Sequence, residues 1–164
     1  KVDSVFWLIT GSNADAGGQV CTEMMQSFAA SHPGRAGFVQ SLGLRRYLSA
    51  MDCAALVAGN SSSGVVETPT FKVPTVNIGK RQAGRTICAN VLCGAPDAAA
   101  IEATMRKALS PSFAPVAASA VSPYGGGDTS GKICAVLHHF DFTKSKVFYD
   151  GPVPEFDPQR SVLV

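Results

Sequence analysis

The sequence has no long apolar run, few charged residues and no paired cysteine motif. No apolar stretch reaches the roughly 18 residues that a membrane span needs, and the opening residues KVDSVFWLIT are not typical of a signal peptide. The five cysteines contain no Cys-x-x-Cys pair, which favours reduced thiols over a disulfide framework or a zinc site. A formal net charge of +2 is too small to indicate nucleic acid or an anionic membrane as partner. We therefore expect a cytoplasmic protein that uses no metal and no cofactor.

The composition indicates one folded domain followed by a short tail. With 46% apolar and 16% charged residues, the chain of 164 residues is too apolar for disorder and long enough to bury a core. The periodic patterns of strands and helices end near residue 141, and three prolines follow Gly151. We predict a domain over residues 1–141 and a tail over residues 142–164, extended from Gly151 onward.

Strand and helix patterns alternate along the domain. The unbroken apolar run that includes Phe6 and Leu8 is typical of a strand buried in a parallel sheet. The recurrence of Val20, Met24 and Phe28 at every fourth position predicts an amphipathic helix. By the same criteria we predict strands at 4–10, 36–39, 54–58, 75–78 and 91–92, helices at 17–31, 42–51, 97–109 and 130–140, and a surface connection at 110–123.

This alternation predicts an α/β fold, a doubly wound parallel sheet with helices on both faces. In such a sheet, ligands bind beside the carboxyl ends of the strands. Three loops follow predicted strands at that edge, namely 11–18, 59–64 and 79–85. We expect the functional site among these loops.

The segment from residue 59 to residue 85 has an unusual composition and reads GNSSSGVVETPTFKVPTVNIGKRQAGR. A helix that begins at Ser62 or Ser63 would direct unpaired backbone N–H groups and the positive end of its dipole at an anion. Gly64 would let a ligand approach the backbone closely. Pro69 predicts that this helix is short or bent.

Two charged residues of the segment complement the serines. The carboxylate of Glu67 suits the vicinal hydroxyls of a ribose, and the guanidinium of Arg81 matches phosphate oxygens. Each feature also has a simpler interpretation, because serine-rich turns cap helices, a glutamate in a first turn pairs with the helix dipole, and loop arginines are mostly solvated. The three features in one crevice favour a site for a nucleoside diphosphate.

The same segment resembles, nearly residue for residue, the C-terminal domain of hydrolysing UDP-N-acetylglucosamine 2-epimerases of the sialic-acid pathway type. The family pattern there is G-N-S-S-x-G-x-x-E…P-x-x-N-x-G-x-R-Q-x-G-R. NADAGG at residues 13–18 resembles the family's P-N-x-D-x-G segment, with Ser12 in place of the proline, and SPYGGGDTSGKICAVL at residues 122–137 resembles its Y-G-x-G-x-A helix start. The likeness covers residues 4–141 and implies a Rossmann-like domain, the C-terminal half of a two-domain B-type glycosyltransferase-like architecture.

The resemblance also implies an activity and a set of binding residues. The reaction would be the conversion of UDP-N-acetylglucosamine and water to N-acetylmannosamine and UDP. Ser61 and Ser62 would hold phosphate, Glu67 the ribose hydroxyls, and Arg81 would face the diphosphate. The full set of implied UDP contacts is Asn13, Leu42 (through the backbone near uracil), Ser61, Ser62, Glu67 and Arg81.

The resemblance further implies that catalytic carboxylates belong to an N-terminal domain outside this sequence. We therefore expect the isolated chain to be inactive, and a missing N-terminal domain or a homo-oligomeric partner to complete it. None of His32, His138 and His139 is expected to be catalytic. A non-catalytic module that binds UDP or a UDP-sugar is the alternative. One half of a glycosyltransferase is a remoter possibility, against which the R-Q-x-G-R loop argues.

A final expectation concerns the centre of the sheet. In the strand order 3-2-1-4-5-6, the predicted strands at 4–10 and 54–58 are strands 2 and 4, and strand 1 would precede Lys1. We therefore expect a gap one strand wide between Leu8 and Leu56, and a longer native protein whose upstream segment supplies the strand. A direct ladder between these two strands would contradict this expectation.

Overall fold

The computed structural model describes residues 5–12, 17–143, 151, 156–157 and 162–163. The chain forms two compact units, Lys1–Pro123 and Tyr124–Val164. The larger unit contains both parallel sheets and all the loops in which we expect the site. The domain boundary that we placed after residue 141 stays a prediction.

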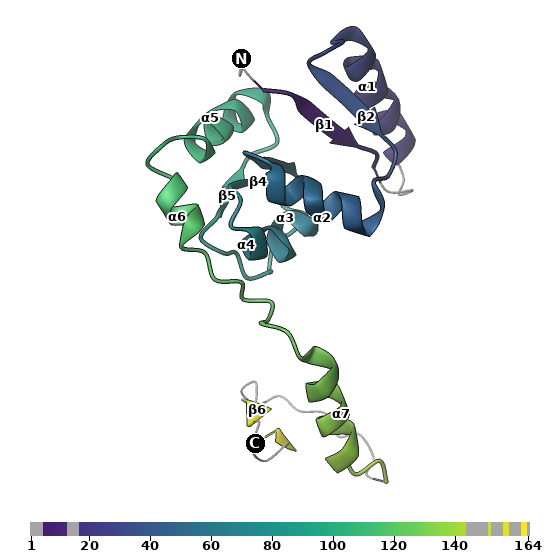
Figure 1. Ribbon diagram of the computed structural model, residues 1–164, viewed down its shortest axis with the longest axis vertical. Coiled ribbons are helices and arrows are strands. Elements are labelled where there is room, and N and C mark those ends of the chain that lie inside the picture. The colour runs from purple at the N-terminus through teal and green to yellow at the C-terminus, as the bar shows by residue number, and fades with distance from the viewer. Residues whose placement is uncertain (1–4, 13–16, 144–150, 152–155, 158–161, 164) are drawn as a thin grey trace. The chain divides into compact units, whose positions relative to one another are not determined.

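The first sheet of the larger unit has two parallel strands. β1 (Trp7–Thr10) pairs with β2 (Ala36–Val39), with Trp7 opposite Ala36 and Thr10 opposite Val39. α1 (Gly18–Ser31) connects them and packs against β2 (Figure 1). His32 ends this helix, as the sequence predicts. The bounds agree with prediction except that β1 begins at Trp7, three residues late, and α1 at Gly18, one residue late.

The second sheet has three parallel strands in the order β3-β4-β5. They are β3 (Val57–Gly59), β4 (Thr75–Ile78) and β5 (Val91–Gly94), which confirms an edge strand at 91–92. α2 (Gly43–Cys53) leads from β2 to β3. It runs two residues beyond its predicted end, because the N–H of Ala54 still donates to Met51 O at 3.1 Å. The strand predicted at 54–58 consequently starts three residues late.

The core lies between the second sheet and the helices that follow it. α5 (Ala98–Ala108) and α6 (Ala114–Ala118) contribute to one buried cluster. Our prediction of a surface connection at 110–123 is therefore wrong. Pro115 suggested a loop, but it occupies the first turn of α6, where a helix tolerates proline. The cluster comprises Val76, Met105, Ala108, Phe113 and Ala117.

The two sheets do not join into one. Within the described residues, β1 pairs with β2 alone and β3 with β4 alone, so no ladder connects β1 to β3. This confirms the expected interruption between strands 2 and 4. The side chain of Trp7 nevertheless packs against the core cluster of the second sheet. The arrangement is that of a Rossmann-like parallel α/β fold with its central strand position open.

The open position leaves predicted core residues exposed. Phe6 and Leu8 are 61% and 47% exposed, although the sequence predicts a buried strand there. The apolar row of α1 is also uncovered, since Val20, Met24 and Phe28 are 60%, 68% and 42% exposed. The burial that the sequence predicts for these residues is therefore not found, because nothing among the described residues covers them.

The smaller unit contains α7 (Thr129–His139) and a short antiparallel pair, β6 (Phe156–Asp157) with β7 (Val162–Leu163). α7 matches the predicted last helix to within one residue at each end. His138 and His139 occupy its final turn. In the part of the chain that the structure describes, no helix has the length and apolarity to cross a membrane.

Candidate functional site

The site is built on the carboxyl ends of two neighbouring strands. β3 and β4 are parallel and in register, with Gly59 opposite Asn77, so the loops that follow them leave the same edge of the sheet. Gly79 begins the second loop with φ 75°, a conformation that favours glycine, and its N–H donates to Gly94 O at 2.9 Å. Both loops were selected from the sequence for this reason.

A buried glutamine ties the two loops together. The Nε2 of Gln82 donates to Asn60 O at 2.9 Å, and Gln82 is only 4% exposed. This links the loop of Arg81 to the serine loop 59–63, across 22 positions of sequence. Sequence reasoning did not single out Gln82. The feature of the sequence that could have indicated Gln82 is its position next to Arg81 in the segment 59–85.

The serine loop has its hydroxyls at the surface. Ser61 and Ser62 are exposed, and the Oγ of Ser61 lies 3.3 Å from the Oγ of Ser63. Ser62 precedes α3 (Ser63–Val66) without making a side-chain cap bond. The helix therefore starts where we predicted, but a dipole summed over four residues is small. The donors that this loop offers an anion are its hydroxyls and individual N–H groups.

Gly64 lies beside the sheet. A Cβ atom at this position would be 3.4 Å from the Cγ2 of Thr75 on β4, at the close end of ordinary van der Waals contact. The close approach of a ligand to its backbone stays a prediction.

Glu67 sits at a break in the helical segment. It ends α3 and precedes α4 (Thr68–Phe71), whose first turn contains the buried Pro69, so the predicted short helix is confirmed. The Oε2 of Glu67 is buried and has no hydrogen-bond partner among the described residues. A buried carboxylate oxygen without a donor is unfavourable.

A buried polar network holds the break in place. The hydroxyl of Thr68 donates to Gly64 O at 2.9 Å. Asn90, which is fully buried, donates through Nδ2 to Thr68 Oγ1 at 3.2 Å and to Val73 O at 2.8 Å. These bonds hold Thr68, the residue that follows Glu67.

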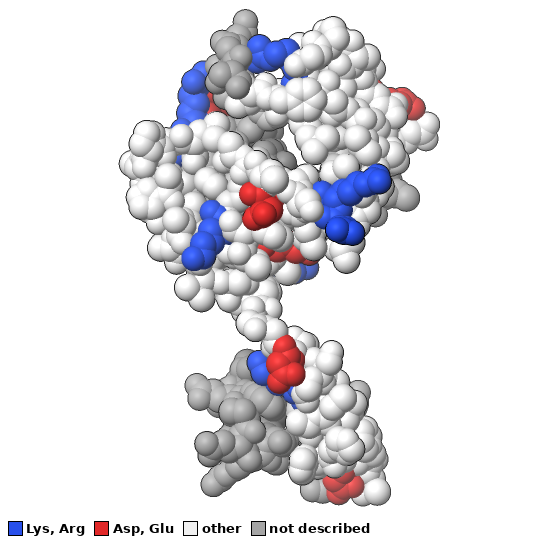
Figure 2. Space-filling model, in the orientation of Figure 1, with Lys and Arg blue, Asp and Glu red and all other residues white. Residues whose placement is uncertain are grey.

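The cationic part of the site lies on the loop after β4. Arg81 and Arg85 are both exposed there. Figure 2 shows charged side chains in small separate groups on the visible face, with no continuous basic area among the described residues. Within the described residues, no group of three His, Cys, Asp or Glu side chains is arranged to hold a metal ion.

The structure brings together four of the six predicted contacts. Ser61, Ser62 and Glu67 follow β3, and Arg81 follows the adjacent β4. Leu42 belongs to a different element, immediately before α2. Asn13 lies outside the described residues. In the loop 11–18, the hydroxyl of Ser12 donates to Gly18 O at 2.6 Å and so connects the start of that loop to α1.

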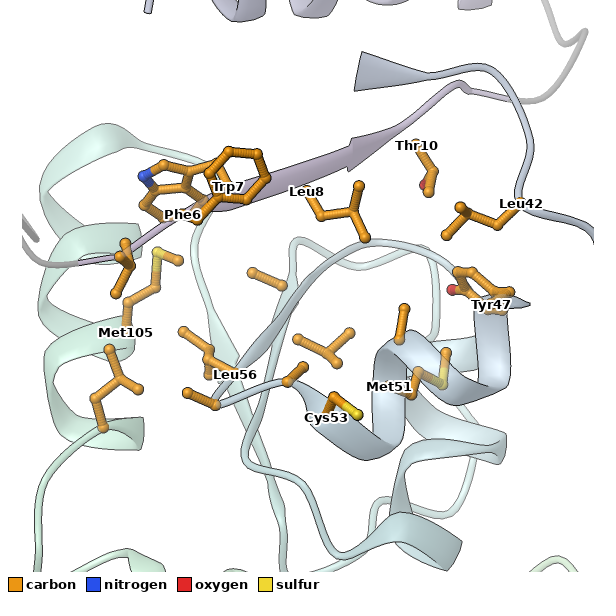
Figure 3. Close-up of a pocket in the computed structure, with 17 residues that line it drawn as sticks. Phe6, Trp7, Leu8, Thr10, Leu42, Tyr47, Met51, Cys53, Leu56 and Met105 are labelled. Atoms are coloured by element: carbon orange, nitrogen blue, oxygen red, sulfur yellow. The ribbon is translucent and has the colours of Figure 1, made fainter. Parts of the chain in front are cut away.

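A groove lies between β1 and β3, at the open strand position. This central groove has a volume of about 470 Å³ and is lined by β1, α2, the segment 54–58 that leads into β3, and α5 (Figure 3). Leu42 lies at one end of it, near Thr10 and Tyr47. None of its lining residues carries a charge, so it does not suit a diphosphate. The described residues thus form a Rossmann-like domain with serine, glutamate and arginine side chains on the segments that follow two adjacent strands.

The comparisons identify the family. The family model described as UDP-N-acetylglucosamine 2-epimerase matches residues 1–138, and the chain belongs to this family. It is 33% identical over 151 residues to polysialic acid biosynthesis protein P7 of Escherichia coli, covering 89% of this chain and 38% of that protein.

Two further relatives are named for a different sugar. The chain is 40% identical over 85 residues to the GDP/UDP-N,N'-diacetylbacillosamine 2-epimerase (hydrolyzing) of Campylobacter jejuni, covering 52% of this chain and 22% of the relative. It is 31% identical over 80 residues to the UDP-N,N'-diacetylbacillosamine 2-epimerase (hydrolyzing) of Legionella pneumophila, covering 49% and 21%. The chain thus spans between 21% and 38% of the length of these curated relatives.

Proposed function

We propose that this chain is the UDP-binding part of a hydrolysing UDP-sugar 2-epimerase that converts UDP-N-acetylglucosamine and water to N-acetylmannosamine and UDP. The observation that carries the proposal is that two linked loops leave adjacent strands, one with exposed serines and followed by Glu67, the other with Arg81. Family membership supports the reaction class.

Each part of the UDP would meet a group of suitable chemistry. The hydroxyls of Ser61 and Ser62 would donate to phosphate oxygens, and Arg81 would add a charge-assisted bond from the next loop. The partly exposed carboxylate of Glu67 would accept from the ribose hydroxyls. Asn13 and the backbone near Leu42, beside uracil, complete the proposed set.

The proposal specifies the nucleotide more directly than the sugar, because two relatives are named for a sugar other than N-acetylglucosamine. Their names give N,N'-diacetylbacillosamine, attached to UDP or GDP. The residues proposed here hold the nucleotide and make no contact from which the sugar follows. We favour N-acetylglucosamine because the serine-to-arginine segment resembles the epimerases of that sugar.

Isothermal calorimetry with UDP and UMP tests the nucleotide site. UDP should bind more tightly than UMP, and Arg81→Ala should weaken UDP binding by about 1.5–3 kcal/mol, the usual cost of a charge-assisted contact. Glu67→Ala should weaken UDP and uridine alike, because it acts on the ribose. Arg106→Ala on α5 is the matched control, since its exposed ion pair with Glu102 lies on another element. Wild-type affinity in both site variants would refute the assignment.

A further inference from the structure

We propose that Cys93 is a site of reversible oxidation, at which a hydroperoxide converts the exposed thiol to a sulfenic acid that the buried carboxamide of Asn77 stabilises. The oxidation site itself does not depend on the nucleotide site. It rests on the position of the thiol in the sheet, on its contact with Asn77 and on the unused hydrogen-bonding capacity of that amide.

Cys93 lies on a face of the second sheet that solvent can reach. It belongs to β5, which pairs with β4 alone among the described strands. Its neighbour Leu92 packs against the core cluster. Because successive side chains of a strand point to opposite faces, Cys93 points away from that core. The thiol is exposed and forms no disulfide, so a small oxidant has access to the sulfur.

Asn77 is the polar partner of this thiol. The two residues are opposite each other in the ladder of β4 and β5, and the Nδ2 of Asn77 donates to the Sγ of Cys93 at 3.7 Å. The same Nδ2 donates to Gly79 O at 3.5 Å. Because a carbonyl oxygen can only accept, the bond to Gly79 fixes which side of the amide carries the nitrogen.

The carboxamide of Asn77 has unused capacity on both of its polar atoms. Asn77 is only 4% exposed, and its Oδ1 is buried without a hydrogen-bond partner among the described residues. Both bonds of Nδ2 are long, and one of them goes to sulfur, which is a weak acceptor. A buried amide in this state favours a change that places a stronger acceptor and a donor beside it.

Oxidation of the sulfur supplies both groups. The thiolate of Cys93 attacks the terminal OH oxygen of a hydroperoxide, and an S–O bond forms as the O–O bond breaks. The sulfur loses two electrons, and the other oxygen leaves as hydroxide or alkoxide and takes up a proton from water. The new oxygen accepts from Nδ2 of Asn77, and its O–H is a donor for Oδ1, which is attached to the same carbon as Nδ2.

A thiol of low molecular weight reverses the change. It condenses with the sulfenic acid to a mixed disulfide and releases water, and a second thiol then displaces the thiolate of Cys93.

The loop of Arg81 is joined to this position through Gly79, the residue that begins it. The carbonyl of Gly79 accepts from Asn77, and its N–H donates at 2.9 Å to the carbonyl of Gly94, which follows Cys93. An amide of Asn77 that turns to the sulfenic oxygen weakens its bond to Gly79. Oxidation of Cys93 should therefore change the conformation at the start of this loop.

Trapping with dimedone tests the site in the complete chain. After treatment with equimolar hydrogen peroxide, mass spectrometry should find about fivefold more dimedone on Cys93 than on Cys21, Cys53 or Cys134. These three cysteines are exposed and are internal controls. Labelling is divided by the rate at which iodoacetamide alkylates each cysteine, which corrects for differences in access. Asn77→Leu removes both polar atoms and should abolish the excess at Cys93.

Two results would overturn the oxidation site. Equal corrected labelling of the four exposed cysteines in the wild type would show that Asn77 does not stabilise a sulfenic acid, and this comparison needs no variant. An excess that persists in Asn77→Leu would show that Cys93 is oxidised for another reason.

The effect on the loop is measured separately. The backbone amide signal of Gly79 should shift on oxidation, return with dithiothreitol and stay constant in Cys93→Ala, and an unshifted signal in the oxidised wild type would refute the connection. A severalfold loss of UDP affinity on oxidation is a further expectation, and it rests on the proposed function. A chain that binds no UDP in either state would contradict the proposed function alone, whereas UDP binding that oxidation leaves unchanged would contradict the effect on the nucleotide site.

Discussion

The Nε2 of Gln82 lies 2.9 Å from the carbonyl oxygen of Asn60 and joins the two loops of the proposed nucleotide site. The two loops leave adjacent strands, and their sequences alone do not fix the distance between them. A buried donor at this point fixes the serines relative to the loop of Arg81. The bond is therefore a positioning contact for the site.

Replacement of Gln82 should loosen the site without removing a ligand contact. Gln82→Met keeps the shape of the side chain but loses the donor to Asn60, so we expect a loss of about 0.5–1.5 kcal/mol in the free energy of unfolding. UDP affinity should fall severalfold while Arg81 and Glu67 remain present. Chemical denaturation and calorimetry measure the two effects. Gln26→Met, at an exposed position of α1, should change neither. Unchanged UDP affinity in Gln82→Met would remove the positioning role.

Asn90 and Thr68 should act as one unit. Asn90 donates to Thr68 Oγ1 and Val73 O from a fully buried position. Asn90→Ala leaves buried acceptors without a donor and should destabilise the fold by about 1–3 kcal/mol. Thr68→Val removes the hydroxyl that accepts this hydrogen bond, with little change in the shape of the side chain. A double-mutant cycle by urea denaturation should show a coupling of about 0.5 kcal/mol or more, and simple additivity would show that the bond contributes nothing.

α6 should be essential to the larger unit. Phe113 is 7% exposed within the core cluster, and truncation of a buried phenylalanine to alanine typically costs about 3–5 kcal/mol. Phe113→Ala should therefore be largely unfolded or melt at a much lower temperature. Val116→Ala lies on the same helix at a position that is 42% exposed, and it should stay within about 0.5 kcal/mol of the wild type. Calorimetric melting curves distinguish the two, and similar curves would contradict the packing of α6.

The chain of 164 residues should not by itself turn over UDP-N-acetylglucosamine. Removal of a weakly acidic C2 proton needs a positioned base and a site that excludes water. Glu67 is proposed to hold ribose, and the described loops of the site offer no second carboxylate. A coupled assay for UDP release by the purified chain checks this. Release that is lost in Glu67→Gln while UDP still binds would show that Glu67 is catalytic and the prediction wrong.

The strands and helices with strong periodicity follow from the sequence, and the exceptions have physical reasons. The strands at 36–39 and 75–78 match their predicted bounds, because short apolar runs between turns leave little freedom. α6 was missed because Pro115 suggests a loop unless its place in a first turn is known. The exposure of Val20 and Phe6 was not predictable, since the sequence encodes an apolar face but not what covers it.

The residues of the proposed site also divide into those that the sequence indicates and those that it does not. The residues that offer chemistry to a ligand, Ser61, Glu67 and Arg81, can be selected from their type and position. Gln82 and Asn90, which hold them in place, carry no such signal, because buried amides look like surface amides in a sequence. The contact that Gly64 makes with Thr75 on β4 likewise depends on the fold and cannot be read from the sequence.

Trp7 gives the molecule a built-in optical reporter. It is the single tryptophan of the chain, and it belongs to β1 while its ring packs against the core of the other sheet. Its emission wavelength therefore depends on how closely β1 is seated on that core, which makes ordinary fluorescence sensitive to the junction between the sheets. Red-shifted emission at temperatures below the main melting transition would reveal that β1 and β2 detach as a separate cooperative unit.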